Sequence, residues 1–280
     1  MRKQIIVDDQ KQAVQSHLPL SIKPQQCDLR ELTENMARLL PTTPIFVLVH
    51  GAFHGGWCWR QTADLLSAAG ARVFTPTMTG LGERAHLLTR QIGLRTFIDD
   101  VVGVIESEEL ADIVLVGHSF AGAVISGVAD LLSSRIRRLV YLDAIVPENG
   151  LSVISRLPPE TAAKRIRAAE ESSGGISIPI PTGEIFDLPP GPDRDWVARR
   201  ITPHPLAAYT DTIILNGPVG NGPARTYIRC TNPVYSAVQP SYERIKSDNA
   251  WTLIDLATGH DAMVTAPKAL SELLLQCVNA

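Results

Sequence analysis

The sequence predicts an α/β fold, in which a mostly parallel central sheet carries helices on both of its faces. Short and almost continuous apolar segments recur along the chain, as in Ile45–His50 and Ile113–Gly117. Such segments are typical of strands that are buried on both faces. Segments with the apolar spacing of helices alternate with them, which is the order that produces parallel sheets. The 280 residues are 45% hydrophobic and 20% charged, so the chain can bury a substantial core.

Strands and helices alternate through the first half of the predicted domain. The helices end at typical signals, such as Gly70 after the first of them. In chain order we predict a strand at Ile45–His50, a helix at Trp57–Ala69, a strand at Arg72–Thr75, a helix at Thr96–Glu109, a strand at Ile113–Gly117, a helix at Gly122–Leu132 and a strand at Arg138–Ala144.

The alternation stops at residue 147. From there to residue 223 the chain is rich in Pro, Gly and Ser, and we expect this segment to be a cap inserted over the sheet. Strand and helix order returns after it. The predicted elements are helices at Pro159–Glu171 and around Asp193–Arg200 within the cap, then a strand at Arg225–Cys230, a helix at Tyr242–Asp248, a strand at Trp251–Leu256 and a helix at Pro267–Val278.

Residues 1–43 are predicted to be an N-terminal extension of the domain formed by residues 44–280. Their apolar pattern is weak, and Pro41 and Pro44 separate them from the regular part. Within them, Asp28–Leu40 has the pattern of one amphipathic helix with an Asp N-cap. An arm that docks or forms a homodimer and a loosely ordered tail both agree with this pattern.

Charge and cysteine usage exclude several classes of function. Lys and Arg number 26 against 29 Asp and Glu, so we expect no nucleic-acid partner. The four cysteines lie far apart and contain no CxxC pair, which argues against a metal site or a disulfide framework and favours the cytoplasm. Ile113–Ala129 is nearly uncharged but shorter than the ~20 residues of a membrane span, so we expect a buried strand and helix there and no membrane partner.

The segment Gly117–Gly122, which reads GHSFAG, is the clearest chemical signal. It lies between a predicted strand and a predicted helix, which is the context of a nucleophile elbow. Small residues two positions before and after the serine, here Gly117 and Ala121, allow the strand and the helix to approach each other. We therefore predict that Ser119 is a catalytic nucleophile.

A serine nucleophile requires a base, and His260 is the best candidate among the seven histidines. It lies in a loop between the last predicted strand and the last predicted helix, and Gly259 before it leaves the backbone free to present the ring. His50 ends the first strand and is expected to fix the neighbouring loop. His118 adjoins the serine, and its side chain is expected to point elsewhere.

An oxyanion hole requires two backbone N–H groups. One should come from Phe120, which follows the nucleophile. The other should come from the glycine-rich loop after the first strand, with Ala52 as the first choice and Phe53 as the alternative. This loop has neither of the glycine patterns that bind nucleotides, so we predict no nucleotide cofactor.

The segments FVLVHGAFHGGWCW, VLVGHSFAG and GHDAM resemble the α/β-hydrolase fold. More narrowly, they resemble the branch of plant methyl-ester esterases and hydroxynitrile lyases, with their bacterial esterase relatives. The resemblance covers about residues 45–278 and is weakest in the predicted cap. It implies that Ser119 is the nucleophile, that His260 is the base, and that Ala52 and Phe120 are the oxyanion donors.

The sequence departs from that branch at the acid of the triad. Those enzymes usually have an Asp just after the strand that here ends at Cys230, but the following residues 232–240 contain no carboxylate. Asp143, at the end of the strand after the nucleophile strand, is the preferred acid. Some α/β-hydrolases, such as haloalkane dehalogenases and zearalenone lactonases, resemble this chain in that position. Asp255 and then Asp248 are the alternatives, while Asp261 adjoins His260 too closely in sequence.

The predicted activity is cofactor-free and metal-free hydrolysis of a carboxylic ester of small to medium size. Phe53 and Trp196 are expected to line a moderately hydrophobic substrate pocket. A lactonase or an amidase would use the same triad. A ligand-binding protein of this fold stays open, and so does a hydroxynitrile lyase. Those lyases, however, have a Lys and a Thr where this sequence has Asp261 and Gly51.

Overall fold

The computed structural model describes residues 43–181, 186, 188–220 and 222–279. Residues 1–42 of the predicted extension, including its predicted helix at Asp28–Leu40, lie outside the described residues. In the described part, a central sheet is covered by helices on both faces, as the sequence predicts.

The central sheet has six strands in the order β2-β1-β3-β4-β7-β8, and every neighbouring pair is parallel. Because parallel strands end at the same edge, the loops that follow them gather there. The strands are β1 (Ile45–Val49), β2 (Arg72–Phe74), β3 (Ile113–His118), β4 (Ile136–Leu142), β7 (Ala224–Cys230) and β8 (Trp251–Leu256).

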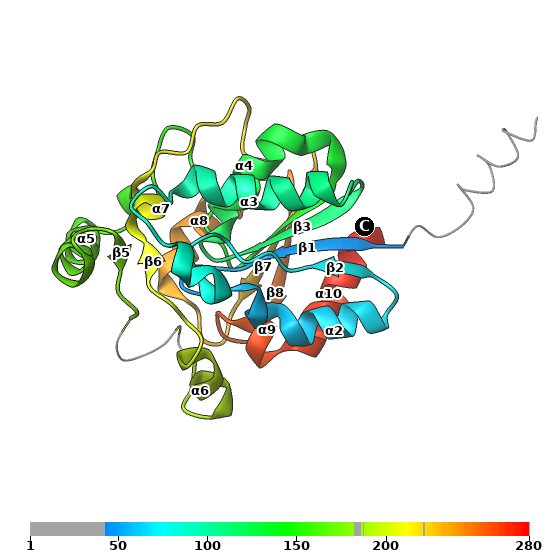
Figure 1. The fold of residues 1–280 in the computed structure, drawn as a ribbon. Coiled ribbons are helices and arrows are strands. Elements are labelled where there is room, and N and C mark those ends of the chain that lie inside the picture. Colours follow the sequence, from blue (N-terminus) through cyan, green and yellow to red (C-terminus); the bar gives the residue numbers. More distant parts are fainter. Residues whose placement is uncertain (1–42, 182–185, 187, 221, 280) are drawn as a thin grey trace, which may run out of the picture. The chain divides into compact units, whose positions relative to one another are not determined.

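Helices lie on both sides of this sheet, with α3 and α4 on one face and α2, α9 and α10 on the other (Figure 1). Their bounds are α2 (Arg60–Ala68), α3 (Leu94–Ser107), α4 (Ala121–Leu132), α8 (Gln239–Ile245), α9 (Ala262–Thr265) and α10 (Pro267–Asn279). Short 3₁₀ helices are η1 (Gly56–Trp59), η2 (Gly82–Leu87), η3 (Ser133–Arg135), η4 (Ile154–Arg156) and η5 (Ser236–Val238).

Ile113–Ala129, the nearly uncharged segment that is almost long enough for a membrane span, forms the centre of the core. All residues of β3 are buried, and so are Ala121–Ala129 of α4. Their uniformly apolar composition follows from burial on both faces of a parallel sheet and beneath its helices. None of the described helices is long and apolar enough to cross a membrane.

The segment between β4 and β7 holds several short elements that the sequence did not all predict. The helices α5 and α6 occur close to their predicted positions. A pair of two-residue strands and the helix α7 were missed because such short elements have no periodicity to detect. The elements are α5 (Pro159–Ser173), β5 (Ser177–Ile178), α6 (Pro192–Ala198), β6 (His204–Pro205) and α7 (Leu206–Thr210), with β5 and β6 antiparallel.

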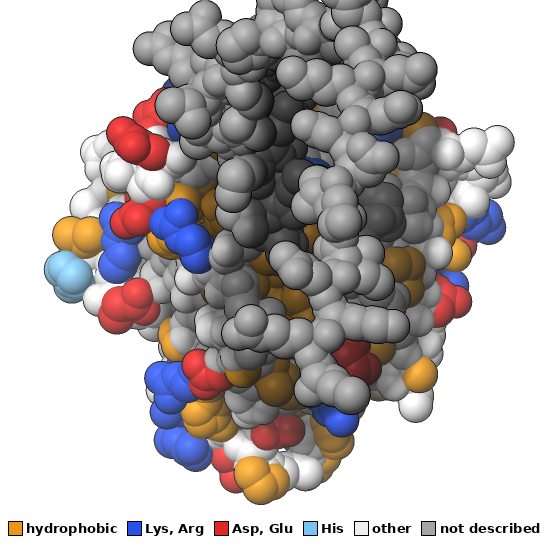
Figure 2. Space-filling view, turned by 90° about the vertical axis from the view of Figure 1, so that its right-hand side faces the viewer, with side chains coloured by type: hydrophobic (Ala, Val, Ile, Leu, Met, Phe, Trp, Pro, Cys, Tyr) orange, Lys and Arg blue, Asp and Glu red, His pale blue; other side chains and the backbone are white. Residues whose placement is uncertain are grey.

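Figure 2 shows the face that lies to the right in Figure 1. On the part of this face that the undescribed residues leave visible, Lys and Arg side chains are interspersed with Asp and Glu. This mixture agrees with the formal net charge of −3 and contains no broad field of one sign on that part.

Candidate active site

Ser119 lies on a sharp turn between β3 and α4. Its φ angle is +55°, a conformation that L-residues rarely adopt and that is typical of strained functional turns. The flanking glycines make this turn possible. A Cβ atom on Gly117 would lie 2.8 Å from the Ala121 carbonyl oxygen, and one on Gly122 would lie 1.9 Å from that of Ile145. The local sequence thus dictates the elbow.

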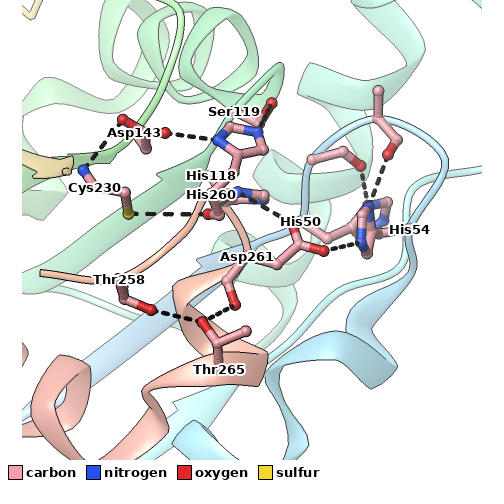
Figure 3. Close-up of polar contacts among 12 residues, drawn as sticks. His50, His54, His118, Ser119, Asp143, Cys230, Thr258, His260, Asp261 and Thr265 are labelled. Carbon is pink, nitrogen blue, oxygen red and sulfur yellow. Dashed lines mark hydrogen bonds and ion pairs between the residues drawn. The ribbon is translucent and has the colours of Figure 1, made fainter. Parts of the chain in front are cut away.

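Ser119, His260 and Asp143 form one line of hydrogen bonds (Figure 3). The Nδ1 atom of His260 lies 2.7 Å from Asp143 Oδ2, and its Nε2 atom lies 2.9 Å from Ser119 Oγ. The carboxylate accepts the Nδ1–H group, so Nε2 is left to accept the serine hydroxyl proton. His260 is only 1% exposed and Asp143 is fully buried, so water does not compete for the bond between them, whereas Ser119 is half-buried.

Asp143 follows β4, and its backbone holds it in place. Its φ angle is +41°, which Asp tolerates better than most residues. Its second carboxylate oxygen accepts the backbone N–H of Cys230, at the end of the neighbouring strand β7. Because β4 and β7 are adjacent, carboxylates at the ends of either strand can reach the same histidine. This adjacency explains how the acid position can differ from that of the branch the sequence resembles.

The alternative acids, Asp255 and Asp248, are not bonded to His260, whose ring nitrogens face Asp143 and Ser119. Both are exposed, Asp255 on the edge strand β8 and Asp248 in the turn before it. Asp248 accepts the backbone N–H of Ala250 instead. Asp261 is buried and faces two other histidines: its Oδ2 atom lies 3.2 Å from His54 Nε2, and its Oδ1 atom lies 3.7 Å from His118 Nε2.

The two backbone groups expected in the oxyanion hole are free of local acceptors. Outside helices and strands, no hydrogen bond between described residues uses the N–H of Ala52 or of Phe120. Phe120 is the N-cap of α4, where an N–H has no partner within the helix. The alternative donor Phe53 is already engaged, because its N–H donates to Nδ1 of the buried His204 at 3.2 Å.

The residues expected to line the pocket belong to an aromatic cluster around the glycine-rich loop. The Phe53 ring lies 6.1 Å from Phe186 and 5.5 Å from His204. Trp196 lies edge-on to Trp57 at 5.0 Å, and the Arg200 guanidinium lies over the Trp196 ring at 4.7 Å. Three aromatic residues of the predicted cap, Phe186, Trp196 and His204, thus contact the glycine-rich loop and the residues that follow it.

Several residues at this site were not singled out as functional from the sequence. Tyr235 stacks on the His260 ring with centroids 3.9 Å apart and planes 25° apart, and it comes from the loop that lacks a carboxylate. His118 points away from Ser119, and its Nε2–H donates to the His260 carbonyl oxygen. From the sequence, Asp261 is considered only as the acid of the triad and is set aside because it adjoins His260.

His118, His260 and Asp261 are the one group in the described part of the chain with the spacing of metal ligands, their ligand atoms lying within 4.8 Å of one another. Both ring nitrogens of His260 are already used by Asp143 and Ser119. A metal ion bound here would break that line of hydrogen bonds. The group therefore fits a hydrogen-bonded network better than a metal site.

Comparison with known proteins agrees with the α/β fold. Residues 46–273 match the model of a family described as the alpha/beta hydrolase family. The chain belongs to the alpha/beta hydrolase family. Its relatives include plant methylesterases and a hydroxynitrile lyase, which form the branch that the sequence motifs resemble.

This hydrolase is 45% identical to a carbendazim hydrolyzing esterase from Nocardioides sp. (strain SG-4G), over 82% of its own chain and 97% of that protein. It is 33% identical to methylesterase 9 from Arabidopsis thaliana, over 66% and 78% of the two chains. Among solved structures, an extracellular alpha/beta-hydrolase from a Paenibacillus species superimposes with a TM-score of 0.71 at 24% identity, covering 83% of this chain and 98% of that one.

Proposed function

We propose that this hydrolase cleaves carboxylic esters through an acyl-enzyme on Ser119. The observation that carries the proposal is the unbroken line from Asp143 through His260 to Ser119, in a family of hydrolases. A serine hydroxyl is a weak nucleophile until a base accepts its proton. In this line, the one acceptor available to that proton is Nε2 of His260.

In the first step, Ser119 Oγ forms a bond to the ester carbonyl carbon while His260 takes its proton. The N–H groups of Ala52 and Phe120 stabilise the oxyanion that develops, and Asp143 stabilises the imidazolium. The carbon–oxygen bond to the leaving alcohol then breaks, and His260 returns the proton to that alcohol. A water molecule, deprotonated by His260, attacks the acyl carbon and releases Ser119 and the acid.

The aromatic cluster supports an uncharged substrate of small to medium size. Phe53 is almost fully buried, and Trp196 packs against Trp57. Carbendazim is a candidate substrate because the 45% identical relative is named for hydrolysing it. A lactone or an amide would use the same steps.

The free, buried state of Cys58, Cys230 and Cys277 supports the cytoplasm as the location.

A covalent probe tests the nucleophile directly. Folded protein should gain one adduct from a fluorophosphonate probe in an intact-mass measurement, with the adduct mapped to Ser119. The S119A variant should gain none. A panel of esters of increasing chain length, lactones, aryl amides and carbendazim then defines the substrate. If S119A hydrolyses the panel as the wild type does, the proposal is wrong.

A further inference from the structure

A second buried histidine–aspartate pair lies beside the first. His54 comes from the glycine-rich loop after β1, and Asp261 directly follows His260 in the chain. The His54 Nε2 atom lies 3.2 Å from Asp261 Oδ2, and the two side chains are 1% and 0% exposed. The pair takes no part in the proposed steps, yet both partners adjoin residues that do.

The hydrogen bonds of His54 require both of its ring nitrogens to donate. Its Nδ1 atom lies 2.8 Å from the carbonyl oxygen of Ala52, which can only accept. Its Nε2 atom faces the carboxylate of Asp261. Two acceptors on the two nitrogens correspond to a doubly protonated imidazolium, paired with an ionised carboxylate.

Proton affinities favour the same charge state. Burial alone would lower the pKa of His54, but the charge and hydrogen bond of Asp261, with the Ala52 carbonyl, raise this pKa above its ordinary value. Burial alone would raise the pKa of Asp261, but His54 and the neighbouring His118 and His260 lower it. The shared proton therefore resides on His54.

Every other titratable group around the pair is neutral or already bonded. Burial lowers the pKa of His50 to about 3 and lowers that of His118 and His204 well below the ordinary value. Burial likewise raises the pKa of the Cys58 thiol, near Asp261. Among these described groups, His54 is the histidine whose contacts favour a positive charge.

The pair connects the two loops that would carry the chemistry (Figure 3). On one side His54 holds the carbonyl of Ala52, the expected oxyanion donor. On the other side Asp261 is the neighbour of His260, whose carbonyl is held by His118. The His54 ring is itself fixed, since Trp57 stacks on it at 5.4 Å and Phe186 contacts it at 4.8 Å.

We propose that His54 and Asp261 are positioning residues. Their ion pair fixes the position of the Ala52 N–H group relative to His260, so that both can act on the same reacting carbonyl. This inference rests on the proposed ester hydrolysis and deepens it. Because Ala52 N–H must point at a developing charge, a small displacement of its loop lowers the rate of the chemical step more than it affects substrate binding.

The test compares the wild type with H54Q, D261N and the H54Q/D261N double variant on one uncharged ester, between pH 6 and pH 9.5. Misplacement by about 1 Å can cost on the order of 100-fold, so kcat should fall about 10- to 100-fold in each single variant, with KM changing much less. The double variant should lose little more than either single variant, since the pair acts as a unit.

The pH profile separates positioning from a purely structural role. In the wild type, kcat should fall as the pH rises past the raised pKa of His54, because the ion pair is lost. That alkaline decline should be absent in H54Q. The controls are H86Q, at an exposed histidine of η2, and D255N, at an exposed aspartate of β8, and both should behave as the wild type does.

Two results would overturn the positioning role. One is that H54Q and D261N keep kcat and the alkaline decline. The other is that the lost kcat is fully accounted for by the fraction of unfolded protein, measured by circular dichroism and by titration of active sites with the fluorophosphonate probe. If the wild type itself neither reacts with the probe nor hydrolyses any ester, the proposed function fails instead, and the two failures are distinguishable.

Discussion

The two buried histidine–aspartate pairs of this protein consist of the same residue types and lie side by side, but their second contacts differ. In both pairs a carboxylate accepts an imidazole N–H, at 2.7 Å for Asp143–His260 and 3.2 Å for Asp261–His54. The remaining nitrogen of His260 faces a hydroxyl group, which can donate. The remaining nitrogen of His54 faces a carbonyl oxygen, which cannot.

This difference assigns opposite properties to the two imidazoles. A histidine between a carboxylate and a hydroxyl has a nitrogen free to take a proton during a reaction. A histidine between a carboxylate and a carbonyl already carries both protons and can only hold its neighbours. The comparison teaches that a His–Asp contact alone does not identify a catalytic base, because the partner of the other nitrogen decides it.

The largest effect should come from Asp143. D143N should fold normally but lower kcat by on the order of 10³–10⁴, because an amide can neither stabilise the imidazolium nor fix the correct tautomer. Steady-state kinetics on the best ester of the panel measures the effect. D255N is the matched control, since Asp255 is exposed on β8. Normal turnover in D143N with loss in D255N would assign the acid to Asp255.

Removing the ring above His260 should have an intermediate effect. A tyrosine face over a developing imidazolium contributes about 1 kcal/mol, so Y235A should lower kcat by roughly fivefold. Y235F keeps the aromatic face and should retain most of the activity. If Y235A and Y235F lose activity equally, the hydroxyl group rather than the stacked ring is responsible.

Trp196, which is proposed to line the substrate pocket, should affect binding more than turnover. W196A removes apolar contacts beside Trp57, and a loss of about 1 kcal/mol would raise KM by roughly fivefold while kcat stays near that of the wild type. Kinetics on short and long esters measures the split. A drop in kcat with unchanged KM would show that Trp196 acts on the chemistry instead.

The smallest effect is a dependence of stability on pH. The raised pKa of His54 stabilises the fold below its ordinary pKa, and this contribution is lost as the pH rises through the raised value. The lowered pKa of Asp261 stabilises the fold above its ordinary pKa, and that contribution is lost as the pH falls through the lowered value.

Calorimetry of the wild type and H54Q therefore measures the pair directly. Between neutral and alkaline pH, the wild type should lose part of its Tm advantage over H54Q, because the contribution from the raised pKa of His54 is lost in that range. The H86Q control should parallel the wild type throughout. A constant difference between wild type and H54Q across this range would contradict a charged His54.

Much of this fold follows from local sequence signals. The uniformly apolar β3 predicts burial on both faces, and Gly117 and Gly122 are required by a turn that leaves no room for a Cβ atom at either position. The order of strands then brings the end of β4 beside that of β7. Asp143 could be selected from the sequence because it ends the strand after the nucleophile strand, and the structure brings it within hydrogen-bonding distance of His260.

Contacts between distant segments could not be predicted in the same way. His54 and Asp261 are 207 positions apart, and His204 reaches the Phe53 N–H across 151 positions. No periodicity links such residues, and their partners are set by tertiary packing. The two-residue strands β5 and β6 were missed for the same reason, since each exists only through its pairing with the other.

The protonation states of His54 and His260 test the central comparison most directly. Nitrogen NMR of ¹⁵N-histidine-labelled protein, assigned with the H54Q and H260Q variants, reports both nitrogens of each ring. At pH 6.5, the ordinary pKa of histidine, most of His54 should show two protonated nitrogens, because its pKa is raised. His260 should show a protonated Nδ1, because that nitrogen donates to Asp143. A His54 that is mostly neutral at pH 6.5 would contradict the account.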